Sequence, residues 1–170
     1  MSASIAVNVP CRLWTVAVPG ARALVRRAAR AALAAPAPRR NPSGDDRAEL
    51  AIVLADNAML RDLNRRFRGK NKPTNVLSFP GEDANVPAGE SVALGDVAIA
   101  FETAVAEAAA EGKTVADHLA HLVVHGVLHL RGYDHVRAAD AERMEALEAR
   151  VLGRIGVADP YAEPAREPAR

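Results

Sequence analysis

Hydrophobic and polar positions along the chain predict four strands and about five helices. Short apolar runs bounded by turn residues predict strands at residues 5–9, 49–55, 74–79 and 93–100. Longer stretches with helical spacing predict helices at residues 19–35, 57–67, 101–112, 114–132 and 137–152. Asp56 is a suitable N-cap for the second helix, and Gly112 and Gly132 are suitable ends for the third and fourth. Strands and helices that do not alternate regularly indicate an α+β fold, in which the helices pack on a small mixed sheet.

The chain is expected to form one domain. It has 170 residues, of which 49% are hydrophobic and 25% charged, so it can bury a core without cross-links. We expect this domain to span residues 1–157, with the proline-rich stretch 35–46 as a surface loop and residues 158–170 as a disordered tail.

Other features of the sequence point to the cytoplasm. Cys11 is the only cysteine, which excludes a secreted module held together by internal disulfides. No apolar run approaches the roughly 18 to 20 residues of a membrane span. The first ten residues also lack the basic region of a signal peptide.

Charge is distributed unevenly between the two parts of the chain. Residues 1–72 hold 14 Lys and Arg against 5 Asp and Glu, a net charge of +9, whereas residues 73–170 carry −8. The densest basic segment spans residues 61–72, and its positive side chains are Arg61, Arg65, Arg66, Arg68, Lys70 and Lys72. Such a segment is typical of a phosphate-binding surface, although a solvated helix face followed by a loop would have the same composition.

All five histidines of the chain fall within residues 118–135. His125 and His129 are four residues apart on a predicted helix, so their imidazoles lie one turn apart on the same face and can reach one metal ion. Gly132 allows the chain to leave the helix in a left-handed conformation, which carries His135 back toward the same ion. Three histidine ligands with one open position are typical of a catalytic zinc site, although imidazole also suits nickel, copper and iron.

Three further residues are candidates for supporting roles around this site. His121 lies one turn before His125 and is a candidate hydrogen-bond donor behind the ligands or part of the cavity wall, whereas His118 is expected to be an ordinary exposed or partly buried residue. Asp134 either orients an imidazole, acts on a proton or satisfies the backbone of the turn. Asp96, inside an apolar strand, needs a partner, and the basic segment around Arg68 is one candidate.

Two segments of the sequence resemble the diagnostic motifs of a known family. HLVVHGVLHLRGYDH, residues 121–135, resembles the H-x-x-x-H-x-x-x-x-x-H signature of the YbeY family, bacterial metal-dependent endoribonucleases that act in ribosomal RNA maturation. FRGKNKPTNVLSFP, residues 67–80, is similar to the second diagnostic segment of that family, and LGDVAIA, residues 94–100, occupies the place of its following strand. Arg131 departs from the family pattern, in which leucine is common before the glycine.

The resemblance carries functional expectations for this chain. It implies a zinc site of His125, His129 and His135 and a functionally important arginine at Arg68. It also implies a small mixed sheet packed with helices, and a role in 16S ribosomal RNA 3′-end processing and ribosome quality control, with precursor RNA and the small ribosomal subunit with its proteins as partners.

The residues themselves suggest a mechanism that agrees with this resemblance. A zinc ion held by three histidines lowers the pKa of its water from 15.7 to about 7, which makes a hydroxide nucleophile available. The alternative role of the ion is to polarise the phosphate. Arg68 can bind two phosphate oxygens at once, and Arg65, Arg66, Lys70 and Lys72 can follow an RNA backbone.

Two alternatives remain open at this stage. A zinc peptidase has similar histidine spacing, but the general-base glutamate of H-E-x-x-H enzymes is replaced here by Gly126. The second alternative is a non-catalytic ribosome-biogenesis factor with a structural metal and a basic docking surface. RNA that is bound but never cut would favour this alternative.

Overall fold

Four strands form one mixed sheet in the computed structural model, which describes residues 3–36, 47–70, 74–81 and 90–162. The strands are β1 (Ser4–Asn8), β2 (Ala48–Ala55), β3 (Val76–Pro80) and β4 (Val92–Ala100). Their order in the sheet is β1-β2-β4-β3, with β1, β2 and β4 parallel and β3 antiparallel to β4. All four predicted strands are confirmed.

Six helices complete the described part of the chain. They are α1 (Leu13–Ala17), α2 (Ala21–Leu33), α3 (Asn57–Arg68), α4 (Phe101–Glu111), α5 (Val115–Leu130) and α6 (Ala138–Arg154). The predicted α+β fold and its five longer helices are confirmed. Helix α1 is not predicted from the sequence, because five residues are too few to show a helical period.

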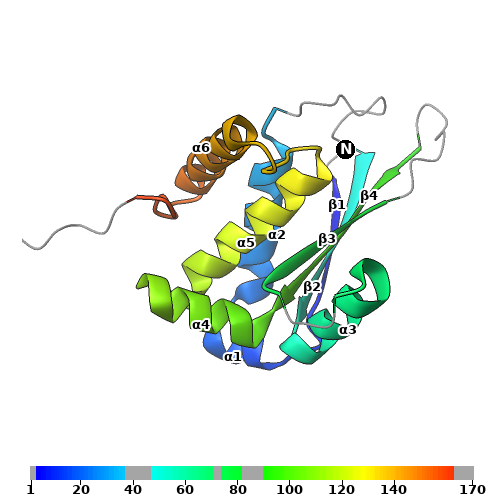
Figure 1. The fold of residues 1–170 in the computed structure, drawn as a ribbon, viewed down its shortest axis with the longest axis vertical. Coiled ribbons are helices and arrows are strands. Elements are labelled where there is room, and N and C mark those ends of the chain that lie inside the picture. The colour runs from blue at the N-terminus through cyan, green and yellow to red at the C-terminus, as the bar shows by residue number, and fades with distance from the viewer. Residues whose placement is uncertain (1–2, 37–46, 71–73, 82–89, 163–170) are drawn as a thin grey trace, which may run out of the picture.

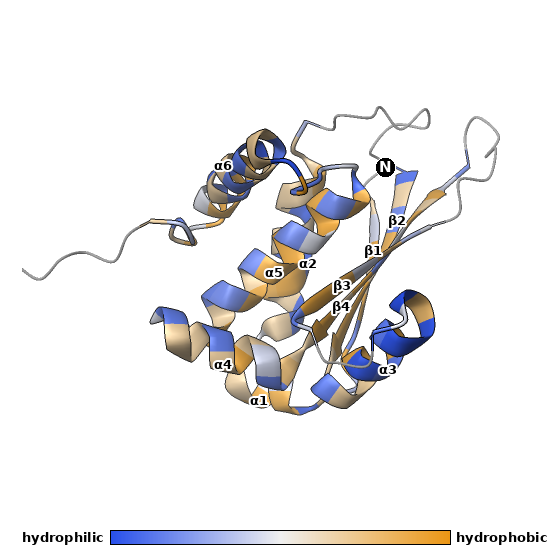
Figure 2. Ribbon diagram, in the orientation of Figure 1, coloured by the Kyte–Doolittle hydropathy of each residue, from blue (hydrophilic) through white to orange (hydrophobic). Residues whose placement is uncertain are grey.

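The elements form layers around the sheet (Figure 1). Helices α2 and α5 cover one face, and α6 packs on the outer side of these two helices. Helix α3 packs on the opposite face, over a smaller apolar cluster that includes Ala55, Leu60 and Leu77. Colouring by hydropathy shows apolar residues on the sheet and a strongly polar α3 (Figure 2). One layer of helices therefore supplies most of the core, and the basic helix lies across the sheet from it.

The predicted helix ends have the expected local structure. Asp56 caps α3, because its Oδ1 accepts a hydrogen bond from the backbone N–H of Met59 at 2.9 Å. Gly112 ends α4 in a left-handed conformation with φ of 66°. Thr114 then caps α5 by accepting from the N–H of Asp117 at 3.1 Å. Because these caps set where α5 begins, they also fix where its histidines lie relative to the sheet.

Arg131 is a buried cation that joins the end of α5 to the end of α2. Its Nη1 donates to the carbonyls of Ala32 at 2.9 Å and Leu33 at 2.6 Å, and also to that of Ala35. These are carbonyls at the C-terminus of α2, where backbone acceptors lack helical partners and the helix dipole favours positive charge. The departure from the family pattern at Arg131 therefore has a structural reason.

Several expectations fall on residues outside the described ranges. Most of the predicted loop 35–46, and residues 163–170 of the predicted tail, belong to this group. Residues 158–162 are described, however, and Tyr161 within them makes side-chain hydrogen bonds. The described domain therefore extends beyond the predicted boundary at residue 157, because these contacts fix the chain against α5 and α6.

Candidate metal centre

His125, His129 and His135 converge at one end of α5. Their potential ligand nitrogens all lie within 4.8 Å of one another. The ring centroid of His129 is 4.7 Å from that of His125 and 4.8 Å from that of His135. The structure thus brings together the three residues that the sequence analysis selects as metal ligands.

The turn after α5 places His135 beside the helical pair. Helix α5 ends at Leu130, and Gly132 follows with φ of 100°, a backbone conformation that favours glycine. The Oδ1 atom of Asp134 accepts hydrogen bonds from the backbone N–H groups of His135 at 2.7 Å and Val136 at 3.2 Å. Of the roles considered for Asp134, these contacts correspond to the satisfaction of the turn backbone.

The histidine cluster fits a metal ion in its chemistry and its spacing. Zinc binds imidazole nitrogens at about 2.0 to 2.1 Å in a tetrahedron, so its ligand atoms are about 3.4 Å apart, which small rotations of these rings can reach. Burial and the neighbouring His125 and His135 lower the pKa of His129 from 6.5 to about 4. His129 is therefore neutral at physiological pH, which is the form that offers a lone pair to a metal.

Glu148 on α6 lies directly behind the cluster. Its Oε1 accepts from His125 Nδ1 at 2.7 Å, and its Oε2 accepts from His121 Nε2 at 2.7 Å. These hydrogen bonds outweigh the cost of burial and lower the pKa of Glu148 to about 2. A carboxylate that holds one imidazole nitrogen leaves the other nitrogen free for a metal.

Glu148 is not among the site residues predicted from the sequence. A signal was nevertheless present, since Glu148 falls on the same helical stripe as Met144, Leu147 and Val151, all of which are buried. His121 lies near the candidate ligands: its ring meets that of His125 edge to face, with centroids 6.5 Å apart, and its Nε2 donates to Glu148.

A cleft of about 730 Å³ opens in front of the histidines. Its lining includes all three histidines together with Arg68, Lys70 and Ser78. Ser78 joins the two sides, because its carbonyl accepts from Arg68 Nη2 at 3.4 Å and its hydroxyl donates to the Gly126 carbonyl at 3.1 Å. Strand β3 thus connects the last residue of α3 to the ligand helix, which places two cations and the candidate metal site in one cleft.

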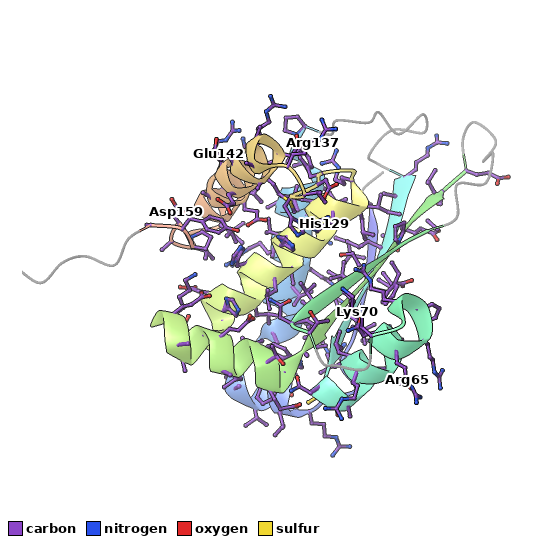
Figure 3. All side chains as sticks on the ribbon, in the orientation of Figure 1. Arg65, Lys70, His129, Arg137, Glu142 and Asp159 are labelled. Carbon is purple, nitrogen blue, oxygen red and sulfur yellow. The ribbon has the colours of Figure 1, made fainter. Side chains whose placement is uncertain are left out.

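The other cations of the basic segment are outside this lining. Arg65 and Arg66 are exposed and both pair with Asp62, at 3.0 and 3.2 Å. Figure 3 shows Arg65 on the outer side of α3, whereas Lys70 lies on the side toward β3. Lys72 lies outside the described residues. Of the predicted RNA-binding residues, only Lys70 lines the cleft among those that the structure describes.

Asp96 is not placed near the histidines, contrary to its selection as a candidate supporting residue. Side chains alternate along β4, so Val97 points toward α5 while the exposed Asp96 points to the opposite face. There it lines a separate shallow hollow with Glu49 and Ser4. Its charge needs no partner, because this part of the sheet face is open to solvent.

His118 differs from the expectation of an exposed or partly buried residue, since only 4% of it is exposed. Its Nε2 lies 3.1 Å from Oε1 of Glu107 on α4, and Glu107 also accepts from the side-chain amide of Asn75. This contact joins α4 to α5 at a distance from the metal cluster.

Comparison with known proteins identifies the family of this chain. The family model described as Endoribonuclease YbeY matches residues 19–156. The protein named Endoribonuclease YbeY of Paramagnetospirillum magneticum is 53% identical over 162 residues, which cover 94% of this chain and 96% of that protein. This chain belongs to the Endoribonuclease YbeY family.

Further relatives agree with this assignment. Endoribonuclease YbeY of Rhodospirillum rubrum is 51% identical over 158 residues, which cover 88% of this chain and 77% of the relative. The solution structure of TM1509 from Thermotoga maritima matches with a TM-score of 0.52 at 18% identity, and the match covers 96% of this chain and 99% of the other. That likeness shows the fold.

The region matched by the YbeY family model contains the three histidines, Arg68 and Glu148, whereas Tyr161 lies beyond it. Within the described ranges, no helix combines the length and the apolar character needed to cross a bilayer.

Proposed function

We propose that this chain is a zinc-dependent endoribonuclease that cuts single-stranded RNA, with His125, His129 and His135 as the metal ligands. The observation that carries the proposal is the convergence of these three imidazoles in one cleft with Arg68 and Lys70. Membership of the Endoribonuclease YbeY family supports an RNA substrate. The basic side chains in the cleft agree with this, because an RNA phosphodiester is an anion.

The protein residues bind and orient the substrate in this proposal. Arg68 holds oxygens of the scissile phosphate, where a guanidinium offsets the negative charge that grows in the transition state. Its hydrogen bond to the Ser78 carbonyl keeps the side chain on the cleft side of α3. Lys70, exposed at the same cleft, binds a neighbouring phosphate.

Neighbouring residues fix the positions of two of the proposed metal ligands. Glu148 fixes the ring of His125, and the Asp134 turn fixes the backbone of His135. Bound by three imidazoles with a fourth position open, zinc would supply a water whose pKa is lowered to about 7.

We further propose that the substrate is a ribosomal RNA precursor, cut during maturation of the 16S 3′ end and in ribosome quality control. The small ribosomal subunit and its proteins are then the partners, and the cytoplasm is the place of action. The family name and the uneven charge of the chain support an RNA partner.

Peptide hydrolysis is disfavoured by the packing around Gly126. A glutamate at this position would be the general base of an H-E-x-x-H peptidase. A Cβ atom added to Gly126 would lie 2.6 Å from Cγ1 of Val97, so the fold has no room for that side chain.

Cleavage of a labelled single-stranded RNA tests the proposed activity. Zinc-loaded wild type is compared with His129→Ala purified in parallel, and a chelator is added to a third sample. We expect cleavage by wild type alone, because the variant loses a ligand and the chelator removes the metal. RNA that is bound by both preparations and cut by neither would favour the non-catalytic assembly factor instead.

A further inference from the structure

The segment of residues 159–161 lies against the back of the metal centre. The hydroxyl of Tyr161 donates to Oε2 of Glu148 at 2.5 Å and lies 3.2 Å from Nε2 of His121. The Tyr161 and His121 rings meet edge to face, with centroids 5.4 Å apart. A residue near the end of the chain is thus in contact with the carboxylate that holds a metal ligand.

Two other hydrogen bonds hold this segment in place. Lys113, in the connection between α4 and α5, donates from Nζ to the Pro160 carbonyl at 2.9 Å. Oδ1 of Asp159 accepts from the backbone N–H of Tyr161 at 2.9 Å, which forms a local turn. Figure 3 shows Asp159 beside the C-terminal end of α6. The position of the Tyr161 ring is therefore fixed by several parts of the fold.

The Glu148 carboxylate is buried, with 1% of the residue exposed, and it receives three hydrogen bonds. His125 donates to Oε1, and both His121 and Tyr161 donate to Oε2. An ionised carboxylate only accepts, so each of these groups points a proton at it. Burial and the adjacent carboxylate raise the pKa of the Tyr161 phenol, which keeps its proton on the oxygen.

The three donors fix the rotation of the carboxylate. With Oε2 held from two sides, Oε1 stays aimed at Nδ1 of His125. This contact sets the tautomer of His125, in which Nδ1 carries the proton and Nε2 carries the lone pair. Loss of the Tyr161 hydroxyl would leave the carboxylate free to turn toward His121, and the His125 ring would lose part of its orientation.

We propose that Tyr161 is a positioning residue of the metal centre, acting on His125 through Glu148. This inference rests on the proposed metal site, and it makes residues 159–161 part of that site. Tyr161 does not touch the substrate or the metal, so its effect is on how tightly the metal is held.

Zinc affinity of the full-length chain, measured by competition with a chromophoric chelator, tests this inference. Glu148→Gln keeps the size of the side chain and removes the charge, and we expect zinc binding to weaken by about 10- to 100-fold. Tyr161→Phe removes one oxygen, and we expect zinc binding to weaken by about 3- to 10-fold.

One matched control is available on the same chain. Glu142→Gln removes a charge from an exposed position of α6. This control is expected to bind zinc within twofold of wild type.

The double variant shows whether Tyr161 affects zinc binding only through Glu148 or independently of it. If Tyr161 acts only through Glu148, adding Tyr161→Phe to Glu148→Gln weakens zinc binding no further. The visible spectrum of the cobalt-substituted protein gives a second readout, and we expect both single variants, but not the control, to shift it. A merely structural loss of stability would not shift this spectrum.

The inference would be overturned if Tyr161→Phe bound zinc as tightly as wild type does. It would also be overturned if the effects of the two substitutions on zinc affinity multiplied in the double variant. Should Glu148→Gln fail to fold, the affinity and spectrum of Tyr161→Phe decide the question alone. A wild type that binds no zinc would overturn both this inference and the proposed metal site. A wild type that binds zinc but cuts no RNA would overturn the proposed function only, since the affinities remain measurable.

Discussion

Gly126 lies so close to Val97 that a Cβ atom added to its backbone would be 2.6 Å from the Cγ1 atom of Val97. Helix α5 therefore approaches β4 at a distance that glycine allows and a larger residue does not. Oγ of Ser78 would be 3.3 Å from the same Cβ atom, and it donates to the Gly126 carbonyl. Because Gly126 follows His125 directly, this close approach sets the depth of the ligand helix in the fold.

Gly126→Ala should therefore damage both stability and metal binding. We expect the free energy of unfolding of the metal-free protein to fall by about 1 to 3 kcal/mol, as is usual for overpacked cores. Displacement of α5 should also weaken zinc binding. Urea unfolding and the zinc content after dialysis measure the two effects.

Gly153→Ala is the control for that experiment. Gly153 lies in α6, and a Cβ atom added there would have no neighbour within 4 Å. Alanine should therefore fit and stabilise the helix by up to about 1 kcal/mol. Equal stability of the Gly126 variant and wild type would contradict the packing argument.

Arg68→Ala should abolish most RNA cleavage while the protein keeps its metal. A cation that stabilises transition-state charge is worth about 100-fold or more in rate, and Arg68 is placed in the histidine cleft to do this. Single-turnover cleavage and zinc content are the measurements. Arg66→Ala serves as the comparison, because Arg66 is exposed, pairs with Asp62 and does not line the cleft.

The two arginine variants should differ in the kind of defect they show. We expect Arg66→Ala to lower RNA affinity modestly and to reduce its dependence on salt, with the cleavage rate at saturating RNA unchanged. A similar loss of rate in both variants would contradict a specific role of Arg68. Loss of zinc from Arg68→Ala would instead make that residue structural.

In chelator-treated protein, the pKa of His129 should lie well below that of an ordinary histidine. Its pKa of about 4 in the fold lies below the usual 6.5, so the unfolded chain takes up the proton more readily. The contribution of His129 to stability is present above pH 6.5 and is lost as the pH falls from 6.5 toward 4. An NMR titration of the His129 ring proton measures the pKa directly.

The stability consequence of this pKa has its own check. The urea midpoint of metal-free wild type is compared with that of metal-free His129→Asn at about pH 7 and at about pH 4. Relative to the variant, the midpoint of wild type should be lower at about pH 4 than at about pH 7. A ring titration near the ordinary histidine value, with a pH-independent difference in midpoint, would contradict the expected effect of the neighbouring imidazoles.

Arg131→Met should destabilise the fold by about 2 to 4 kcal/mol, because carbonyls at the end of α2 lose a buried charged donor. Methionine keeps most of the aliphatic volume, so the loss is mainly in hydrogen bonding. Thermal unfolding measures the effect. A change below about 0.5 kcal/mol, the range of an ordinary surface substitution, would show that water replaces the guanidinium without cost.

Local sequence patterns predict most of this fold because its elements depend on neighbouring residues. The i, i+4 histidine pair and Gly132 are such patterns, and the cap at Asp56 needs only the residues that follow it. Helix α1 escapes prediction because its identity comes from tertiary packing. Its Trp14 is fully buried and donates from Nε1 to the Ala55 carbonyl 41 residues away.

Contacts between distant parts of the chain account for what the sequence analysis missed at the site. Glu148 lies 23 residues from His125 on another helix, so spacing within one helix provides no hint of the pair. Asp96 was predicted to support the site, but it lies away from the histidines. Strand alternation places it opposite Val97, and no local pattern indicates that the part of this sheet face around Asp96 is left open.

Cleavage of labelled single-stranded RNA, followed while zinc is added back to chelator-stripped protein, tests most directly whether the histidine cluster is the catalytic centre. We predict that the rate rises with added zinc and levels off at about one ion per chain, and that His129→Ala stays inactive throughout. Full activity of the stripped protein, or an equal rise in the variant, would contradict a catalytic metal at this site.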